Sequence, residues 1–222
     1  MDKLVLPGDI LPAKEAIEMI TKVDLGPPIE VPPIPEEAKP GGLAKEEEEF
    51  FVSEITRLAK ERNALILSHN YQIPGIQEVA HYLGDSLFLA QKGVESDADI
   101  IVEAAVLFMP QILEIMKKRR GQIILAPDLN ALCSLAAHAD PKKILDWKKD
   151  NKTGQVIMYV NTYVETKALT DYCCASANAA KVIEYVTEKH PDVPLLFGPD
   201  VNLGYFAVKH LQKIGHSIDR LW

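Results

Sequence analysis

Residues 61–86 read ERNALILSHNYQIPGIQEVAHYLGDS and set the pattern for most of the chain. A short apolar run, ALILSHN at 64–70, ends in polar residues and leads into an amphipathic stretch. Short apolar runs alternating with helical patterns predict an α/β fold with short parallel sheets covered on both faces. The further apolar runs lie at 99–106, 122–128, 155–161, 171–176 and 193–200, and the amphipathic stretches lie at 75–93, 109–119, 141–150, 163–169, 177–190 and 202–213.

The pattern repeats after 90 residues. In both copies a strand ends in polar residues, and a serine follows at the predicted start of a helix. The corresponding residues, each pair 90 positions apart, are His69 and Tyr159, Tyr71 and Asn161, and Ser86 and Ser176. Ligands of parallel α/β sheets bind beyond the carboxyl ends of the strands, and helix N-termini favour anions. The repeat predicts one pocket for a small phosphorylated or carboxylated substrate, unless both serines only cap their helices.

The proline distribution divides the chain. Eight of the 15 prolines lie within residues 1–40, which predicts an extended N-terminal extension over residues 1–42 with a short helix at 13–20. A helix is expected from Lys45 onward, because apolar residues recur there at helical spacing. The repeat then predicts a first α/β unit over residues 43–133 and a second over residues 134–222.

Composition excludes several classes of protein. The formal net charge is −8, whereas a sequence-independent nucleic-acid binder is normally basic, so no nucleic-acid partner is expected. No apolar run approaches the ~18 residues of a membrane span, and the first residues do not form a signal peptide. The three cysteines are too few for a disulfide framework. They are typical of reduced thiols in a cytoplasmic protein, where a thiol can also bind a metal.

The ordered motifs identify a family. The segment 61–92, PDLNALCSLA at 127–136, MYVNT at 158–162 and FGPDVNLG at 197–204 together resemble quinolinate synthase. That resemblance implies tandem pseudo-symmetric, three-layer α/β units around a central site. It also implies condensation of iminoaspartate with dihydroxyacetone phosphate, which gives quinolinate for NAD biosynthesis. Each of three units in the family supplies one cysteine to a 4Fe-4S cluster.

The resemblance assigns roles to the residues of the repeat. It implies that Cys133 is the first cluster ligand, because thiolate is the usual ligand of iron–sulfur clusters. His69 and Tyr71 are the catalytic candidates, since an imidazole can exchange a proton near neutral pH. The residues implied to bind substrate are His69, Ser86, Tyr159, Asn161 and Ser176. No ligand role is implied for Cys173 or Cys174.

The chain departs from the family pattern in three places, one of which is Gly75, where the family usually has a glutamate. The family reads F-M-x-E-T-A-K where this chain has Gln111 and Ile112 in place of the acidic residue and the threonine. The second cluster cysteine and the third unit would lie beyond Trp222, so two of three repeats are expected here. The 222-residue chain is therefore expected not to perform the full reaction alone.

Apolar surface facing the absent unit would favour self-association. The alternative is a non-catalytic remnant that binds small anions or a partner.

Overall fold

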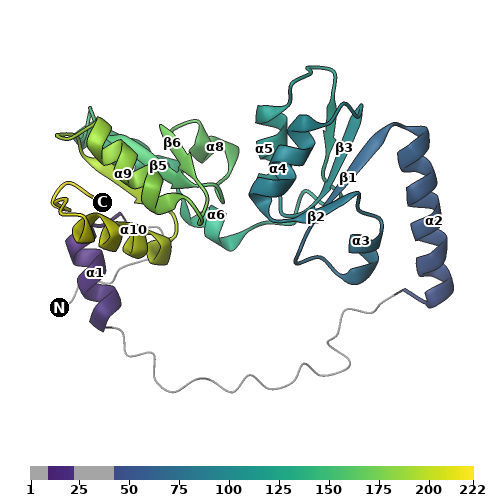
Figure 1. The fold of residues 1–222 in the computed structure, drawn as a ribbon, viewed down its shortest axis with the longest axis horizontal. Helices are drawn as coiled ribbons and strands as arrows, with labels where there is room; N and C mark the ends of the chain where they lie inside the picture. Colours follow the sequence, from purple (N-terminus) through teal and green to yellow (C-terminus); the bar gives the residue numbers. More distant parts are fainter. Residues whose placement is uncertain (1–9, 23–42) are drawn as a thin grey trace.

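The structure, a computed structural model, describes residues 10–22 and 43–222 (Figure 1). The chain forms two α/β units, each built around its own parallel sheet. Most of the predicted extension over residues 1–42 lies outside the described residues. Its described part contains helix α1 (Ala13–Lys22), which confirms the helix expected there. Within 10–22 and 43–222, no helix is both long enough and apolar enough to cross a bilayer.

The first unit contains a four-stranded parallel sheet with the strand order β2-β1-β3-β4. Helices α4 and α5 cover one side of this sheet, and α2 lies on the other side (Figure 1). The core between the sheet and α4 and α5 contains Leu67, Ile101 and Phe108, all nearly inaccessible to solvent. The elements are α2 (Lys45–Glu61), β1 (Ala64–His69), α3 (Pro74–Glu78), β2 (Tyr82–Gly84), α4 (Ser86–Glu95), β3 (Ile100–Ala104), α5 (Phe108–Met116) and β4 (Ile123–Leu125).

The second unit contains a three-stranded parallel sheet with the order β6-β5-β7. Alternating residues of β5 enter two cores: Ile157 packs in one with α9 and α10, and Val156 packs in the other with Trp147 of α7. This sheet is therefore covered on both faces, as predicted. The elements are α6 (Ser134–His138), α7 (Pro141–Asp150), β5 (Gln155–Tyr159), α8 (Val164–Lys167), β6 (Tyr172–Cys174), α9 (Ala179–Lys189), β7 (Leu195–Gly198) and α10 (Val201–Lys213).

The 90-residue spacing recurs in the register of the two sheets. His69 of β1 lies opposite Gly84 of β2, and Tyr159 of β5 lies opposite Cys174 of β6. Both members of the second pair are 90 positions after those of the first. The central strands of both sheets therefore end at equivalent points, and the candidate residues that follow them occupy equivalent loops.

A side chain just before the edge strand repeats in the same way. The backbone N–H of Ile66 donates to His81 Nδ1 at 3.0 Å, and the backbone N–H of Val156 donates to Asp171 Oδ2 at 2.8 Å. In both units, a side chain that directly precedes the edge strand accepts a hydrogen bond from a backbone N–H of the central strand. The equivalence of the two units thus extends to individual hydrogen bonds, although the residue types differ.

Three local expectations were wrong or incomplete. The stretch 75–93 is not one helical segment, because β2 pairs with β1 between α3 and α4. A short helix, α6, also follows Cys133 and was not expected. Ser176 does not open a helix: α9 begins at Ala179, and residues 176–178 form a turn. Ser86 does begin α4.

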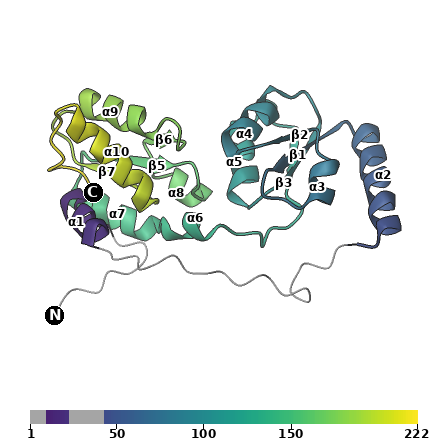
Figure 2. The ribbon, with the colours of Figure 1, turned by 60° about the horizontal axis from the view of Figure 1, so that its bottom comes forward.

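The segment between β4 and α7 connects the units along one side of the molecule (Figure 2). Cys133 lies in this connection, directly before α6. Two residues of the second unit, Val160 and Tyr163, pack against the apolar core of the first. The backbone N–H of Val164 also donates to Gln111 Oε1 at 3.1 Å. The two units therefore contact each other around Cys133 and the N-terminus of α8.

Helix α1 belongs to the second unit in space. Its first residue, Ala13, is buried in the core with α9 and α10, and its N–H donates to the carbonyl of Leu221 at 2.8 Å. Leu221 in turn bridges to Leu195 of β7. Figure 1 shows α1 beside α10 and close to the C-terminus. Residues from both ends of the chain thus complete the second unit.

Candidate functional site

Three candidate residues of the first unit form one cluster. The imidazole of His69 stacks on the ring of Tyr71, with 3.9 Å between the ring centroids. The Tyr71 hydroxyl accepts a hydrogen bond from the backbone N–H of Val106 at 2.8 Å. Met109 Sδ lies 3.5 Å from Ser86 Oγ and 3.9 Å from Tyr71 Oη. Met109 therefore links the two hydroxyl groups that the sequence predicted to act together.

Neither candidate serine is the N-cap of its helix. Asp85 caps α4 by accepting from the N–H of Phe88 at 2.8 Å, which leaves Ser86 as the first helical residue. In the second unit the N-cap is Asn178, whose side chain accepts from the N–H of Ala175 at 2.7 Å. The interpretation of both serines as simple helix caps is therefore wrong.

The candidates of the second unit lie on the equivalent loops. Burial raises the pKa of Tyr159, the carboxylate of Asp200 raises it further, and the neighbouring side chain of Ser176 lowers it. Asn161 Oδ1 is buried and has no hydrogen-bond partner in the part of the chain that the structure describes. An unpartnered buried amide oxygen carries a desolvation cost that a bound donor would remove.

Cys133 lies between the two clusters. Its N–H donates to the hydroxyl of Tyr163 at 2.9 Å, and that hydroxyl donates to the Cys133 carbonyl at 3.2 Å. Burial raises the pKa of Tyr71 and that of Tyr159, and the thiol of Cys133 adds to both shifts. Electrostatic influence of this kind requires proximity. The charge of one thiol thus acts on a tyrosine from each unit.

Burial also determines the protonation states of the candidate residues. Burial lowers the pKa of His69 below its ordinary value of 6.5, although Asp85 opposes this shift. The imidazole is then mainly neutral at pH 7 and can accept a proton. Tyr71 and Tyr159 have raised pKa values, so both phenols remain protonated and can donate hydrogen bonds.

The described residues do not form a complete cluster site. No group of three or more His, Cys, Asp or Glu side chains suited to a metal ion occurs within residues 10–22 and 43–222. Burial raises the pKa of the Cys174 thiol to about 12 and also raises that of Cys173, which disfavours the thiolate that binds iron. Cys133 is the one cysteine of the candidate site, and a single thiolate does not hold a 4Fe-4S cluster.

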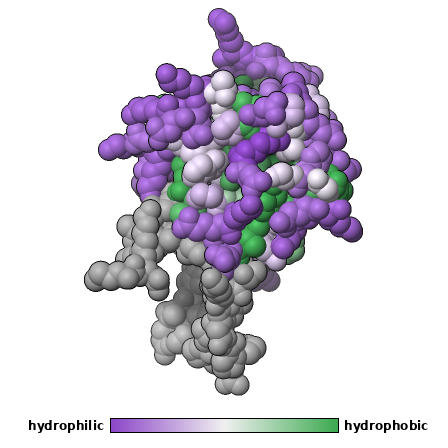
Figure 3. Space-filling view, turned by 90° about the vertical axis from the view of Figure 1, so that its left-hand side faces the viewer, coloured by the Kyte–Doolittle hydropathy of each residue, from purple (hydrophilic) through white to green (hydrophobic). Residues whose placement is uncertain are grey.

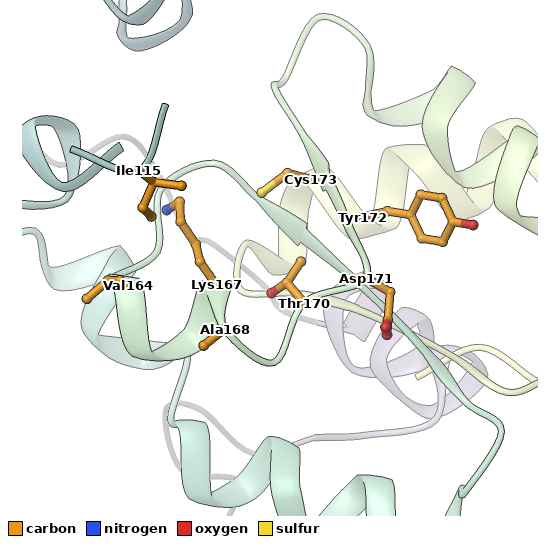
Figure 4. A pocket seen from close by; sticks show the side chains of 8 residues that line it. All are labelled: Ile115, Val164, Lys167, Ala168, Thr170, Asp171, Tyr172 and Cys173. Carbon is orange, nitrogen blue, oxygen red and sulfur yellow. The ribbon is translucent and has the colours of Figure 1, made fainter. Parts of the chain in front are cut away.

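A pocket of about 460 Å³ lies where α8 and β6 of the second unit meet Ile115 (Figure 4). It is lined by Ile115 of the first unit and by residues of α8 and β6, among them Lys167 and Cys173. None of the candidate substrate-binding residues lines it.

On the face of the second unit drawn in Figure 3, hydrophobic residues form narrow patches between hydrophilic ones.

Sequence reasoning missed several residues that shape the site. Met109, Val106 and Tyr163 contact candidate residues only because of tertiary packing, and no sequence pattern indicated them. Glu103 is a buried carboxyl group, 1% exposed, on the central part of β3. It adds to the raised pKa of Tyr71, although burial and Cys133 contribute more. The unexpected acidic residue in an apolar strand, DIIVEAAV at 99–106, was a visible signal.

These observations define a class: an α/β protein of repeated units with short parallel sheets, in which the candidate residues follow equivalent strand ends. The chain belongs to the quinolinate synthetase A family, whose model, described as "Quinolinate synthetase A protein", matches residues 53–218. The repeated α/β units with short parallel sheets are the fold that the sequence resemblance implied.

Curated relatives named quinolinate synthase are similar to much of this chain. The protein from Pyrobaculum aerophilum is 42% identical over 169 residues, which cover 76% of this chain and 52% of the relative. The protein from Thermus thermophilus is 44% identical over 156 residues, covering 70% and 49%. The protein from Nostoc sp. is 38% identical over 174 residues, covering 78% and 51%. The chain thus spans about half the length of these relatives.

Proposed function

We propose that the two units form part of a quinolinate synthase site in NAD biosynthesis, which condenses iminoaspartate with dihydroxyacetone phosphate. The observation that supports this most directly is the equivalence of the two strand ends: His69 and Tyr159 end β1 and β5 in the same register, and Tyr71 and Asn161 follow them on equivalent loops. Two anionic substrates require several hydrogen-bond donors in one place. Hydroxyl groups from both units meet that requirement.

The proposed roles follow from the chemistry of each side chain. Ser86 and Ser176 donate hydrogen bonds to the phosphate or carboxylate oxygens of the substrates, as do Tyr71 and Tyr159. Asn161, with its unpartnered buried oxygen, accepts a hydrogen bond from a substrate hydroxyl or imine N–H. His69 acts as the general base, since its lowered pKa keeps the imidazole neutral and able to accept a proton.

Cys133 is proposed as one ligand of the family's cluster. The described residues supply no second and third thiolate beside it, so we propose that the 222-residue chain does not complete the reaction by itself. Substrate binding is proposed to be separable from iron binding, because the proposed binding residues contact the substrate through their own hydroxyl, amide and imidazole groups.

A second candidate function is anion binding without catalysis. It is favoured by the segment that departs from the family pattern. Ile112 is buried in the apolar core, and Gln111 bonds to the backbone of Val164. The two residues that replace the family's acid and threonine thus serve packing and contact between the units. Ile112 offers no polar group to a substrate, and the amide oxygen of Gln111 is already engaged.

Binding of dihydroxyacetone phosphate, measured by calorimetry, tests the shared part of both functions. Ser86→Ala and Ser176→Ala should each weaken binding about tenfold, which corresponds to one hydrogen bond to a charged group. Ser53→Ala, in an exposed position of α2, is the matched control and should bind like the wild type. Unchanged affinity in both site variants would contradict the proposed pocket.

Anaerobic reconstitution with iron and sulfide separates the two functions. The chain alone should form no quinolinate from iminoaspartate and dihydroxyacetone phosphate. Iron uptake that depends on Cys133 and is lost in Cys133→Ala would favour the quinolinate synthase site over the iron-free alternative. Quinolinate formation together with an oxygen-sensitive cluster spectrum would show that the chain is active alone and would contradict the proposed inactivity.

A further inference from the structure

One side chain in the first unit holds the loop that carries Tyr71. Gln77 Nε2, in α3, donates to the carbonyl of Asn70 at 3.1 Å and to the carbonyl of Gln72 at 2.7 Å. These two carbonyl groups immediately precede and follow Tyr71. A single amide group therefore fixes the backbone on both sides of a candidate residue.

The second unit has the same arrangement with a different residue. Lys167 Nζ, in α8, donates to the carbonyl of Val160 at 2.8 Å and to the carbonyl of Thr162. It also donates to the Thr162 hydroxyl at 3.1 Å. These carbonyl groups immediately precede and follow Asn161. Figure 4 shows the side chain of Lys167 extending from α8.

The two arrangements coincide in the repeat. Donor, first acceptor and second acceptor each lie 90 positions apart: Gln77 and Lys167, Asn70 and Val160, Gln72 and Thr162. A glutamine and a lysine share no charge and little shape beyond a nitrogen that can donate at least two hydrogen bonds. The shared feature is therefore the bridging of two carbonyl groups, which otherwise lack strand partners beyond the end of β1 or β5.

The lysine is fully engaged in this bridge. Its ammonium group has three donors, and the three bonds to Val160 and Thr162 use all of them. The ring centroid of Phe108, in the first unit, lies 5.7 Å from Nζ. Lys167 is thus positioned to hold the Asn161 loop and is not available to bind a substrate anion directly.

We propose that Gln77 and Lys167 are equivalent positioning residues, which bridge the carbonyl groups on either side of Tyr71 and Asn161 and thereby orient these two side chains toward the bound substrate. This inference rests on the proposed function, because it assigns Tyr71 and Asn161 to the substrate site. It extends that function to two residues that contact no substrate.

The residue exchange between the units provides the test. Lys167→Met removes all three bonds but keeps a long side chain, whereas Lys167→Gln installs the group that the first unit uses for the same bridge. Binding of dihydroxyacetone phosphate should weaken at least about tenfold in Lys167→Met and return to within about threefold of the wild type in Lys167→Gln. Lys152→Met, at an exposed lysine, is the control and should not change binding.

Exchange of the Thr162 amide measures the bridge without any ligand. This N–H donates to the Val160 carbonyl at 2.8 Å, next to the bond from Lys167. Its hydrogen exchange should accelerate at least about tenfold in Lys167→Met and remain near the wild-type rate in Lys167→Gln. Denaturant midpoints of the variants show whether any change in binding or exchange reflects global unfolding.

The outcomes separate the two ideas. Suppose that the wild-type chain binds no dihydroxyacetone phosphate, while the Thr162 amide exchanges faster in Lys167→Met and at the wild-type rate in Lys167→Gln. This result would refute the proposed function but would still support the bridge between the two carbonyl groups. Normal binding in Lys167→Met would overturn the positioning role. Failure of Lys167→Gln to restore binding and exchange would overturn it as well, because the ammonium charge and not the bridge would then be required.

Discussion

His69 and Tyr71 stack on each other, with ring centroids 3.9 Å apart and planes inclined by 27°. The Tyr71 ring of this stack is itself anchored, because its hydroxyl accepts a hydrogen bond from the backbone N–H of Val106, shortly after the end of β3. The imidazole is therefore held at the end of the central strand by a partner that is itself anchored. Its burial lowers the pKa of His69.

The first prediction concerns the titration of His69. In the free chain its imidazole should titrate below 6.5, since desolvation disfavours the charged form. Binding of dihydroxyacetone phosphate should raise this pKa, because a nearby phosphate stabilises the imidazolium. NMR titration of the ring protons measures both values, and the other histidines serve as internal references. An unchanged pKa on ligand binding would place the anion elsewhere.

The same shift affects stability. The unfolded chain binds a proton at His69 at a higher pH than the folded chain, so the contribution of His69 to stability is present above about pH 6.5 and is lost as the pH falls. His69→Phe keeps a ring for the stack and should reduce the loss of stability between about pH 7 and pH 5. Denaturant unfolding at several pH values measures this difference.

The second prediction concerns the contact between Tyr163 and Cys133. Tyr163→Phe removes both hydrogen bonds to the Cys133 backbone and should lower the free energy of unfolding by about 1–2 kcal/mol. The loop should also loosen, so an alkylating reagent should modify the Cys133 thiol faster than in the wild type. Mass spectrometry of labelled peptides identifies which cysteine reacts. Tyr82→Phe, at an exposed tyrosine, is the control, and equal rates in both variants would contradict the prediction.

The third prediction concerns the buried carboxyl group of Glu103. Burial raises its pKa from 4.5 to about 8, and its Oε2 atom has no hydrogen-bond partner in the described part of the chain. Between these two pH values the unfolded chain releases the proton while the folded chain retains it. The stability of the folded chain therefore falls as the pH rises from about 4.5 to about 8 and is level above that.

Glu103→Leu should remove this slope. Relative to wild type, the variant should gain about 2–5 kcal/mol of stability between pH 5 and pH 9, since one pKa unit corresponds to about 1.4 kcal/mol. Denaturant midpoints at both pH values measure the gain. Glu165→Gln, at an exposed glutamate, should keep the wild-type slope. A parallel pH dependence in Glu103→Leu and the wild type would show that Glu103 ionises normally.

The fourth prediction concerns self-association. Leu129 and Leu132 are 67% and 62% exposed in the loop that leads to Cys133. Apolar side chains so exposed favour association between copies of the chain. Light scattering should detect species larger than the monomer, and a Leu129→Ser, Leu132→Ser double variant should shift the population toward the monomer. A wild type that is strictly monomeric at all concentrations would refute the expectation.

Alternation of apolar runs and helical patterns was sufficient to predict an α/β fold with parallel sheets, and the 90-residue repeat was needed to predict two units. The strand β2 was missed because its three residues are mainly exposed and gain their strand geometry from pairing with β1. Its equivalent, Tyr172–Cys174, was recognised as part of an apolar run. A shift of that run by 90 residues would have predicted β2. The same shift applied to Lys167 would have indicated Gln77 as its equivalent in the first unit.

The site was predictable in its residue types but not in its contacts. The repeat indicated His69, Tyr71 and Ser86 together, and the structure places them in one cluster. The role of Met109 in joining the two hydroxyl groups depends on how α5 packs, which no spacing encodes. The start of α9 was placed too early because ASANAA is compatible with a helix throughout. The structure instead uses the bond from the Ala175 N–H to Asn178 to form a turn.

The bond between Ala13 and Leu221 has a consequence for synthesis of the chain on the ribosome. The first sheet has all of its strands once residue 125 has emerged, so the first unit can form early. Helix α1 emerges before it but cannot dock until Leu221 has left the exit tunnel. Among the described helices, α1 is therefore made first but completes its docking only after Leu221 is available, and until then its apolar face is open to chaperones.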